Sequence, residues 1–214
     1  MENYNTVLFD FDGTLMDTGR VIIQSWQQTY RTLENREEEE DVIIRTFGEP
    51  LALSMEKTFP TVPVEESLKI YRDYQYGHYE EFISLFPGME ALVRELKERG
   101  YKLGIVTSRL KRTTIRGLEK YHLTDCFGTV ITMEDTDKHK PDPAPVNAAL
   151  EKLQARAEDA VLLGDTMYDI LCAKNAGVTS VLVGWATAVT EEEKTGPDKP
   201  DYILEEANDL MGLL

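Results

Sequence analysis

The stretch VLFDFDGTLMDT, residues 7–18, runs from apolar residues into two aspartates that flank a single phenylalanine. Residues i and i+2 of a strand point the same way, so Asp10 and Asp12 are expected to project together while Phe11 turns into the core. Gly13 permits a sharp turn directly after them. Two carboxylates this close repel each other unless a cation or a shared proton compensates them. Simple solvent exposure at a strand end is the alternative for the pair taken alone.

Similar apolar runs recur along the chain and alternate with helical patterns. The runs are TVLFDF (6–11), KLGIVTS (102–108), GTVIT (128–132), AVLLGD (160–165) and TSVLVGW (179–185). Between the first two, residues 89–96 carry apolar side chains at helical intervals, and Gly100 suits the position just past a helix end. Strands that alternate with helices indicate an α/β fold with a Rossmann-like parallel sheet as its core.

The segment 16–86 interrupts this alternation, because it shows helical patterns and no convincing strand. Apolar residues of the segment 21–33 are spaced as on an amphipathic helix, and the tyrosine-rich segment 66–83 predicts another helix. We therefore expect a helical cap domain, residues 16–86, inserted into an α/β catalytic core formed by residues 1–15 and 87–214.

Composition excludes several functions. The 214 residues carry a net charge of -16, which argues against a general nucleic-acid or anionic-membrane surface but not against a small anionic substrate. No run approaches the roughly 20 apolar residues of a membrane helix. The start, MENYNTVLFD, lacks the features of a signal peptide, so a cytoplasmic protein is the default expectation. No feature fixes the oligomeric state.

Polar residues also follow the later strands. Thr107 and Ser108 could hold an anion with a hydroxyl and helix N-terminal amides, although the pair is also an ordinary N-cap signal. Lys138 and Lys140 precede a helix start that contains prolines. A lone lysine in that position would usually have no special role.

The stretch GDTMYD adds Asp165 and Asp169 at the end of another strand. Asp165 could simply cap a helix that begins near Thr166, whereas for Asp169 the alternative is an isolated exposed acid. All these residues fall at C-terminal strand ends, where ligands bind in open α/β sheets. Carboxylates at one such edge suit Mg²⁺, which would also explain why two aspartates are tolerated side by side.

This set of motifs, DFDGT, VTS, the lysine of KPDP and GDTMYD, resembles that of the haloacid dehalogenase-like superfamily of phosphohydrolases. The resemblance covers nearly the whole chain. The helical insert looks like the cap of the subgroup that includes phosphoglycolate phosphatases, bacterial pyrophosphatases of this fold and β-phosphoglucomutases. The resemblance implies a Mg²⁺-dependent phosphatase of a small phosphorylated metabolite, with phosphoglycolate or inorganic pyrophosphate favoured.

The resemblance also implies roles for the acidic residues. Asp10 would be the nucleophile that forms an aspartyl-phosphate, and its second oxygen would bind Mg²⁺. Asp12 would protonate the leaving group and then activate water, while its backbone carbonyl faces the metal. Asp165 would ligate Mg²⁺, and Asp169 would do so directly or through a metal-bound water.

The remaining implied roles concern the phosphoryl group. Thr107 and the backbone amide of Ser108 would hold it, and Lys140 would neutralise charge on the nucleophile and the phosphate. Lys138 is the weaker candidate, because the lysine of the family lies directly before the proline. Positioning and cation or amide contacts do most of the work in phosphoryl transfer.

Substrate selection is expected to fall to the helical cap. The loop IRTFGEPL contains Gly48, which permits a close turn, and Arg45, which could meet a second anionic group. Arg109, directly after VTS, is another candidate for that contact. Arg45 on a solvated helix is the alternative.

Two other functions remain open from the sequence. A β-phosphoglucomutase-like sugar-phosphate mutase shares the fold and motifs, although its members more often have a bulkier residue than Thr14 at that position. A phosphorylatable, non-catalytic switch of the receiver type also gathers aspartates, a hydroxyl residue and a lysine around Mg²⁺. Asp12 argues against the switch, because an adjacent base hydrolyses a phosphoaspartate.

Overall fold

The computed structural model describes residues 4–214. The chain forms two compact units, one of residues Met1–Asp17 and Leu85–Leu214 and the other of residues Thr18–Ser84. The first is an α/β unit and the second is helical. The division falls at a two-stranded sheet in which β2 (Met16–Asp17) pairs with β3 (Ser84–Leu85).

A six-stranded parallel sheet is the centre of the α/β unit, in the order β5-β4-β1-β6-β7-β8. The strands are β1 (Thr6–Phe9), β4 (Lys102–Val106), β5 (Thr129–Ile131), β6 (Ala160–Gly164), β7 (Thr179–Val183) and β8 (Tyr202–Leu204). The central strands are buried along nearly their whole length, as expected for a parallel sheet covered on both faces. The predicted α/β fold class is confirmed.

The strand order reverses beside β1. The chain moves from β1 outward to β4 and β5, and then returns to place β6 on the other side of β1. Such a reversal is where open α/β sheets bind ligands, beyond the carboxyl ends of the strands. The ends of β1, β4 and β6 are therefore the place where polar side chains meet.

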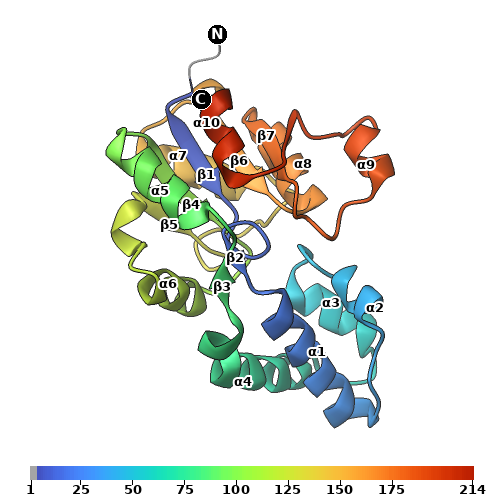
Figure 1. Cartoon of the computed structure of the whole chain (residues 1–214). Helices are drawn as coiled ribbons and strands as arrows, with labels where there is room; N and C mark the ends of the chain where they lie inside the picture. Colours follow the sequence, from blue (N-terminus) through green and yellow to red (C-terminus); the bar gives the residue numbers. More distant parts are fainter. Residues whose placement is uncertain (1–3) are drawn as a thin grey trace. The chain divides into compact units, whose positions relative to one another are not determined.

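Helices cover both faces of this sheet (Figure 1). α7 (Ala144–Leu153) and α8 (Met167–Ala176) lie on one face, and α5 (Met89–Glu98) and α10 (Leu210–Leu213) on the other. α6 (Lys111–Lys120) and α9 (Glu191–Thr195) complete the crossovers, and short 3-10 turns precede β5, β6 and α10. Gly100 has a φ of 84° just past the end of α5, as the sequence predicted.

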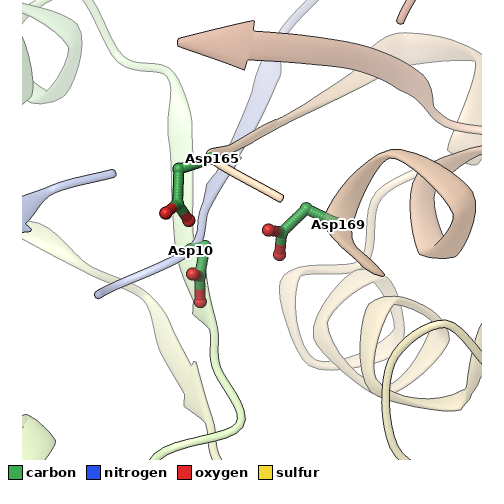
Figure 2. Close-up of side chains that lie close together, drawn as sticks. All are labelled: Asp10, Asp165 and Asp169. Carbon is green, nitrogen blue, oxygen red and sulfur yellow. The ribbon is translucent and has the colours of Figure 1, made fainter. Parts of the chain in front are cut away.

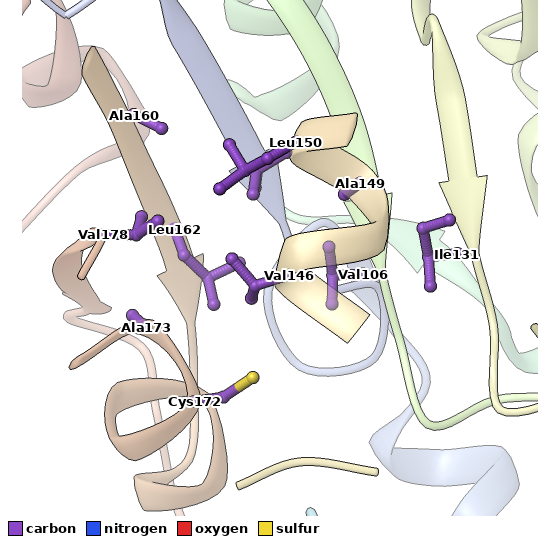
Figure 3. Close-up of a cluster of buried hydrophobic side chains, with 11 residues drawn as sticks. Val106, Ile131, Val146, Ala149, Leu150, Ala160, Leu162, Cys172, Ala173 and Val178 are labelled. Atoms are coloured by element: carbon purple, nitrogen blue, oxygen red, sulfur yellow. The ribbon is translucent and has the colours of Figure 1, made fainter. Parts of the chain in front are cut away.

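The core between α7, α8 and the sheet is a cluster of small and branched apolar side chains (Figure 3). Val146 and Ala149 of α7 pack toward Val106 of β4, and Cys172 and Ala173 of α8 pack toward Leu162 of β6. Fully burying one such aliphatic side chain stabilises the fold by about 1.5–3 kcal/mol. This packing fixes the strand ends on which the candidate site is built.

The helical unit contains α1 (Gly19–Glu34), α2 (Glu40–Ile44), α3 (Leu51–Thr58) and α4 (Val64–Phe82). Its core is aromatic: Trp26 contacts the rings of Tyr30, Phe59 and Tyr71 at centroid distances of 5.8–6.3 Å. The helices predicted over 21–33 and 66–83 are confirmed. Within residues 4–214, no helix is both long enough and apolar enough to cross a membrane.

Candidate active site

Three buried carboxylates meet beyond the carboxyl ends of β1 and β6. Asp10 follows β1, Asp165 follows β6, and Asp169 lies in the first turn of α8. One oxygen of each lies within 4.8 Å of the others, and Figure 2 shows the three side chains close together. All are at most 6% exposed. The motifs DFDGT and GDTMYD, far apart in the sequence, therefore contribute to one cluster.

Asp165 is accommodated by the turn after β1. Gly13 has a φ of 74°, and a Cβ atom added there would lie 2.0 Å from Asp165 Oδ2. The Thr14 hydroxyl points toward Asp165 Oδ1 at a long 3.5 Å. Glycine is thus required at position 13 both for the backbone conformation and for the space that the Asp165 carboxylate occupies.

Asp169 has a structural role that the sequence analysis did not expect. Thr166, not Asp165, is the N-cap of α8, and Asp169 completes its capping box. Asp169 Oδ2 accepts hydrogen bonds from the Thr166 amide at 3.1 Å and the Thr166 hydroxyl at 2.7 Å. The alternatives considered for the two residues, Asp165 as the cap and Asp169 as an isolated exposed acid, are excluded because Thr166 is the N-cap and Asp169 is buried.

Lys140 lies between two members of the cluster. Its ammonium donates to Asp10 Oδ1 at 2.8 Å, to Asp169 Oδ1 at 2.5 Å and to the Val106 carbonyl at 3.3 Å. The Lys140 side chain is 4% exposed, whereas Lys138 is 72% exposed and pairs with Asp142 at 3.3 Å. The structure therefore brings Lys140, and not Lys138, to the carboxylates.

The ionised cluster carries more negative than positive charge. Burial raises the pKa of Asp10 to about 7; Lys140 opposes the rise, and the Asp169 and Asp12 carboxylates add to it. Burial likewise raises the pKa of Asp165 well above its usual value, with repulsion from Asp169 and Asp10 adding to the effect. The Lys140 pKa is also raised: burial opposes this, but Asp10 and Asp169 outweigh it.

This arrangement fits a divalent cation. Three carboxylates face one ammonium, so the ionised cluster keeps two negative charges that a divalent cation would balance. Carboxylate oxygens are the donors preferred by Mg²⁺. Asp10, Asp165 and Asp169 are the side chains that could hold such an ion. Asp12, expected to act through its backbone carbonyl, contributes no carboxylate to the cluster.

The Asp12 side chain is instead paired with Arg109. Asp12 Oδ1 accepts a hydrogen bond from Arg109 Nη1 at 2.7 Å, and the two side chains are 25% and 5% exposed. The expectation that Asp10 and Asp12 project together from one strand is wrong, because β1 ends at Phe9 and Asp12 lies in a turn bridged to Met16. Phe11 is fully buried, as predicted.

Thr107 and Ser108 follow β4 at the same edge. The Thr107 hydroxyl accepts a hydrogen bond from the Arg109 amide at 3.2 Å. The Ser108 hydroxyl is buried and has no hydrogen-bond partner among residues 4–214. The helix begins only at Lys111, and its first amide donates to Glu134 Oε2 at 2.6 Å, so that amide is not available to an anion as the sequence suggested. The hydroxyls of Thr107 and Ser108 therefore remain as the candidate anion contacts at the carboxyl end of β4.

Trp185 is a residue that the sequence analysis missed. Its indole Nε1 donates to the Gly13 carbonyl at 3.1 Å, and its ring lies 5.4 Å from that of Phe86. Trp185 therefore fixes the turn that accommodates Asp165. Its position just after β7, in the run TSVLVGW, is the signal that could have identified it.

The two expected substrate contacts in the helical unit lie around a short loop. Arg45 is exposed at the C-cap of α2, and Gly48 has a φ of 81° within the loop before α3. The left-handed conformation of Gly48 is the close turn that the sequence predicted.

Comparison with known proteins identifies the family. The profile of the family described as haloacid dehalogenase-like hydrolase matches residues 7–183. The chain belongs to the haloacid dehalogenase-like hydrolase family. The resemblance inferred from the motifs is thus confirmed, and with it the expected enzyme class of hydrolase.

Relatives of this hydrolase include curated pyrophosphatases. A pyrophosphatase PpaX from Bacillus cereus is 37% identical over 214 residues, covering 98% of this chain and 96% of the relative. A pyrophosphatase PpaX from Halalkalibacterium halodurans is 34% identical over 210 residues, with 98% and 96% covered.

Solved structures share the fold. A protein from Lactobacillus plantarum, provisionally named a phosphoglycolate phosphatase, is 25% identical with a TM-score of 0.87, and 99% and 100% of the two chains are covered. A haloacid dehalogenase-like family protein from Streptococcus pneumoniae has a TM-score of 0.88 at 24% identity, with 100% and 99% covered.

Proposed function

We propose that this hydrolase is a Mg²⁺-dependent phosphatase that cleaves inorganic pyrophosphate through an aspartyl-phosphate on Asp10. The observation that carries the proposal is the buried set formed by Asp10, Lys140 and Asp169 at the reversal of strand order. An ammonium 2.8 Å from the Asp10 carboxylate favours its ionised form, which is the form that attacks phosphorus.

The proposed reaction uses Asp10 as the nucleophile and Asp12 as the acid and base. A carboxylate oxygen of Asp10 attacks phosphorus, and the bond to the leaving oxygen breaks as that oxygen takes a proton from Asp12. Water then attacks the phosphorus of the aspartyl-phosphate and gives its proton to Asp12. This releases orthophosphate and restores both carboxyl groups. The Thr107 and Ser108 hydroxyls would donate to the oxygens of the transferring group.

A bound Mg²⁺ would supply positive charge to the phosphoryl oxygens and would lower the repulsion among the carboxylates. Asp10, Asp165 and Asp169 are the side chains proposed to hold it, with the Asp12 carbonyl as a further ligand. Lys140 would keep the nucleophile oriented, because its ammonium also contacts Asp169 and the Val106 carbonyl.

Pyrophosphate is proposed first because curated pyrophosphatases are 34% and 37% identical over almost the whole chain. Phosphoglycolate is the second candidate, supported by the provisional name of one structural neighbour at 25% identity. Both substrates carry a second anionic group beside the transferring phosphoryl group. The mutase and switch alternatives gain no support from these names. The expected cytoplasmic location stays a prediction.

The helical unit is proposed as a cap that supplies specificity, with Arg45 as one of two candidate contacts for the substrate, beside Arg109, and with Gly48 shaping its loop. Arg45→Glu should raise KM for the true substrate with little change in kcat. Arg31→Glu is the matched control, because Arg31 is also an exposed arginine of the helical unit and pairs with Glu37 at 2.6 Å. Equal KM values for the two variants would remove Arg45 from the site.

Phosphate release by the purified protein tests the function directly. Pyrophosphate, phosphoglycolate and several sugar phosphates should be compared with Mg²⁺, with Asp10→Asn as the control. The proposal expects pyrophosphate to exceed the others in kcat/KM by orders of magnitude and expects Asp10→Asn to abolish turnover. A sugar phosphate as the preferred substrate would contradict the proposed activity.

A further inference from the structure

The proposed proton-transfer residue is engaged by another side chain. Arg109 Nη1 lies 2.7 Å from Asp12 Oδ1, and the Arg109 side chain is 5% exposed. Charge-assisted hydrogen bonds of this kind are short and roughly twice as strong as neutral ones. An Asp12 carboxylate held in this way is aimed at the guanidinium and not at a leaving group.

The backbone of Arg109 is fixed on both sides. Its amide donates to the Thr107 hydroxyl at 3.2 Å, and its carbonyl accepts a hydrogen bond from the Met133 amide at 3.2 Å. The Arg109 side chain therefore extends from an anchored backbone next to Thr107 and Ser108. These two residues are proposed to hold the transferring phosphoryl group. A second anionic group attached to that phosphoryl group would lie within the same neighbourhood.

We propose that the Arg109–Asp12 pair is a substrate-controlled latch. The second anionic group of the substrate replaces Asp12 on Arg109, and the released Asp12 turns to the leaving oxygen. A phosphate ester without a second anionic group leaves the pair intact and reacts slowly. The inference rests on the proposed phosphatase function and adds a basis for selecting diphosphates and carboxylated phosphates.

The chemistry of the pair favours exchange over simple opening. A buried guanidinium binds an anionic partner strongly, so a second anion of the substrate can compete with Asp12 for Arg109. The guanidinium presents five N–H donors in a planar fork that matches the oxygens of a phosphate or a carboxylate. Pyrophosphate and phosphoglycolate both offer such oxygens, whereas ethyl phosphate offers none on its leaving group.

The test compares two substrates in three proteins. Wild type, Arg109→Lys and Arg109→Met are assayed with pyrophosphate and with ethyl phosphate, and thermal unfolding establishes that each variant is folded. We expect Arg109→Met to reduce the preference for pyrophosphate by about 100-fold, the effect of losing a hydrogen bond to a charged group. Its kcat for ethyl phosphate should rise, because Asp12 is no longer held by the guanidinium. The preference of Arg109→Lys for pyrophosphate over ethyl phosphate should lie between those of wild type and Arg109→Met.

The outcomes separate the latch from a structural role. If both substrates lose the same factor in both variants, the pair only supports the local fold and the latch is refuted. An unchanged preference in a folded Arg109→Lys refutes it as well, and covers the case in which Arg109→Met fails to fold. A wild type that hydrolyses no phosphate compound overturns the proposed function and the latch together, so the two failures are distinguishable.

Discussion

The Lys140 ammonium lies between Asp10 and Asp169, 2.8 Å from one carboxylate and 2.5 Å from the other. The three residues come from three separate segments, and all are buried. An ammonium in this position serves both the proposed nucleophile and the first turn of α8, because Asp169 also caps that helix. Removing it would take away the ammonium that pairs with both buried carboxylates.

Replacement of Lys140 by methionine should lower kcat/KM by about 1000-fold, because both the nucleophile and the phosphoryl group lose their compensating charge. Lys138→Met is the matched control. Lys138 is 72% exposed and pairs with Asp142 on the surface, so its loss should change kcat/KM by no more than about twofold. Steady-state kinetics of the two variants give the answer, and similar losses would mean that Lys140 has no special role.

Gly13→Ala should abolish Mg²⁺-dependent activity. The added Cβ atom would meet Asp165 Oδ2 at 2.0 Å, and the φ of 74° disfavours any side chain. Gly77→Ala in α4 is the control, since a Cβ atom there meets nothing within 4 Å and should stabilise the helix by about 0.5–1 kcal/mol. Activity and thermal unfolding should be measured for both. An active Gly13→Ala enzyme would show that the Asp165 position is not required.

Trp185→Phe should weaken Mg²⁺ activation while leaving the fold intact. Phenylalanine preserves an aromatic contact with Phe86 but removes the indole N–H that holds the Gly13 carbonyl. The concentration of Mg²⁺ that gives half-maximal activity should rise by about 10-fold, the effect of one hydrogen bond. In Trp26→Phe, where Trp185 is the remaining tryptophan, Mg²⁺ should change the indole emission. If neither the Mg²⁺ dependence of activity nor the indole emission changes, Trp185 does not contribute to the Mg²⁺ site.

Asp135 should contribute stability that depends on pH. Burial alone would raise its pKa, but hydrogen bonds from the Thr132 amide at 2.9 Å and hydroxyl at 2.7 Å, with Lys111 and Lys152 nearby, lower it. A carboxyl with a lowered folded-state pKa stabilises the fold above its unfolded pKa of about 4, and this stability is lost as the pH falls through the folded value. Asp135→Asn should therefore cost about 1 kcal/mol near pH 7 and less at pH 3.

Denaturant unfolding across that pH range measures the effect. Thr132→Val provides the partner variant for a double-mutant cycle, because it removes the hydroxyl donor and keeps the amide. A destabilisation by Asp135→Asn that is the same at both pH values would contradict the ionic origin of the effect.

The sequence predicted the α/β fold well because apolar runs and helical spacing record burial directly. The runs 102–108 and 160–165 end at the positions where β4 and β6 end or just past them. The rule that polar residues at carboxyl strand ends share one edge also brought Asp10, Lys140, Asp165 and Asp169 into one hypothesis. The structure places these residues together.

Side-chain partners were less predictable, because they depend on tertiary geometry. Asp12 lies past the end of β1, so strand alternation could not show that it faces Arg109, 97 residues away. The capping role of Asp169 is different, because Thr166 and Asp169 form a local Thr-x-x-Asp capping box that the sequence could have shown. The hydrogen bond from Trp185 to Gly13 spans 172 residues. No local pattern encodes such distant pairs.

The proposed role of Asp10, formation of the aspartyl-phosphate, can be tested by trapping that intermediate. Asp12→Asn should slow attack by water, so the phosphoenzyme should accumulate when pyrophosphate and Mg²⁺ are added and the reaction is quenched with acid. Borohydride converts a phosphoaspartate into homoserine, and peptide mass spectrometry then locates it. We expect homoserine at position 10 only when substrate is present. Modification at another residue would contradict the role of Asp10. So would the absence of modification in an enzyme that was hydrolysing pyrophosphate when it was quenched.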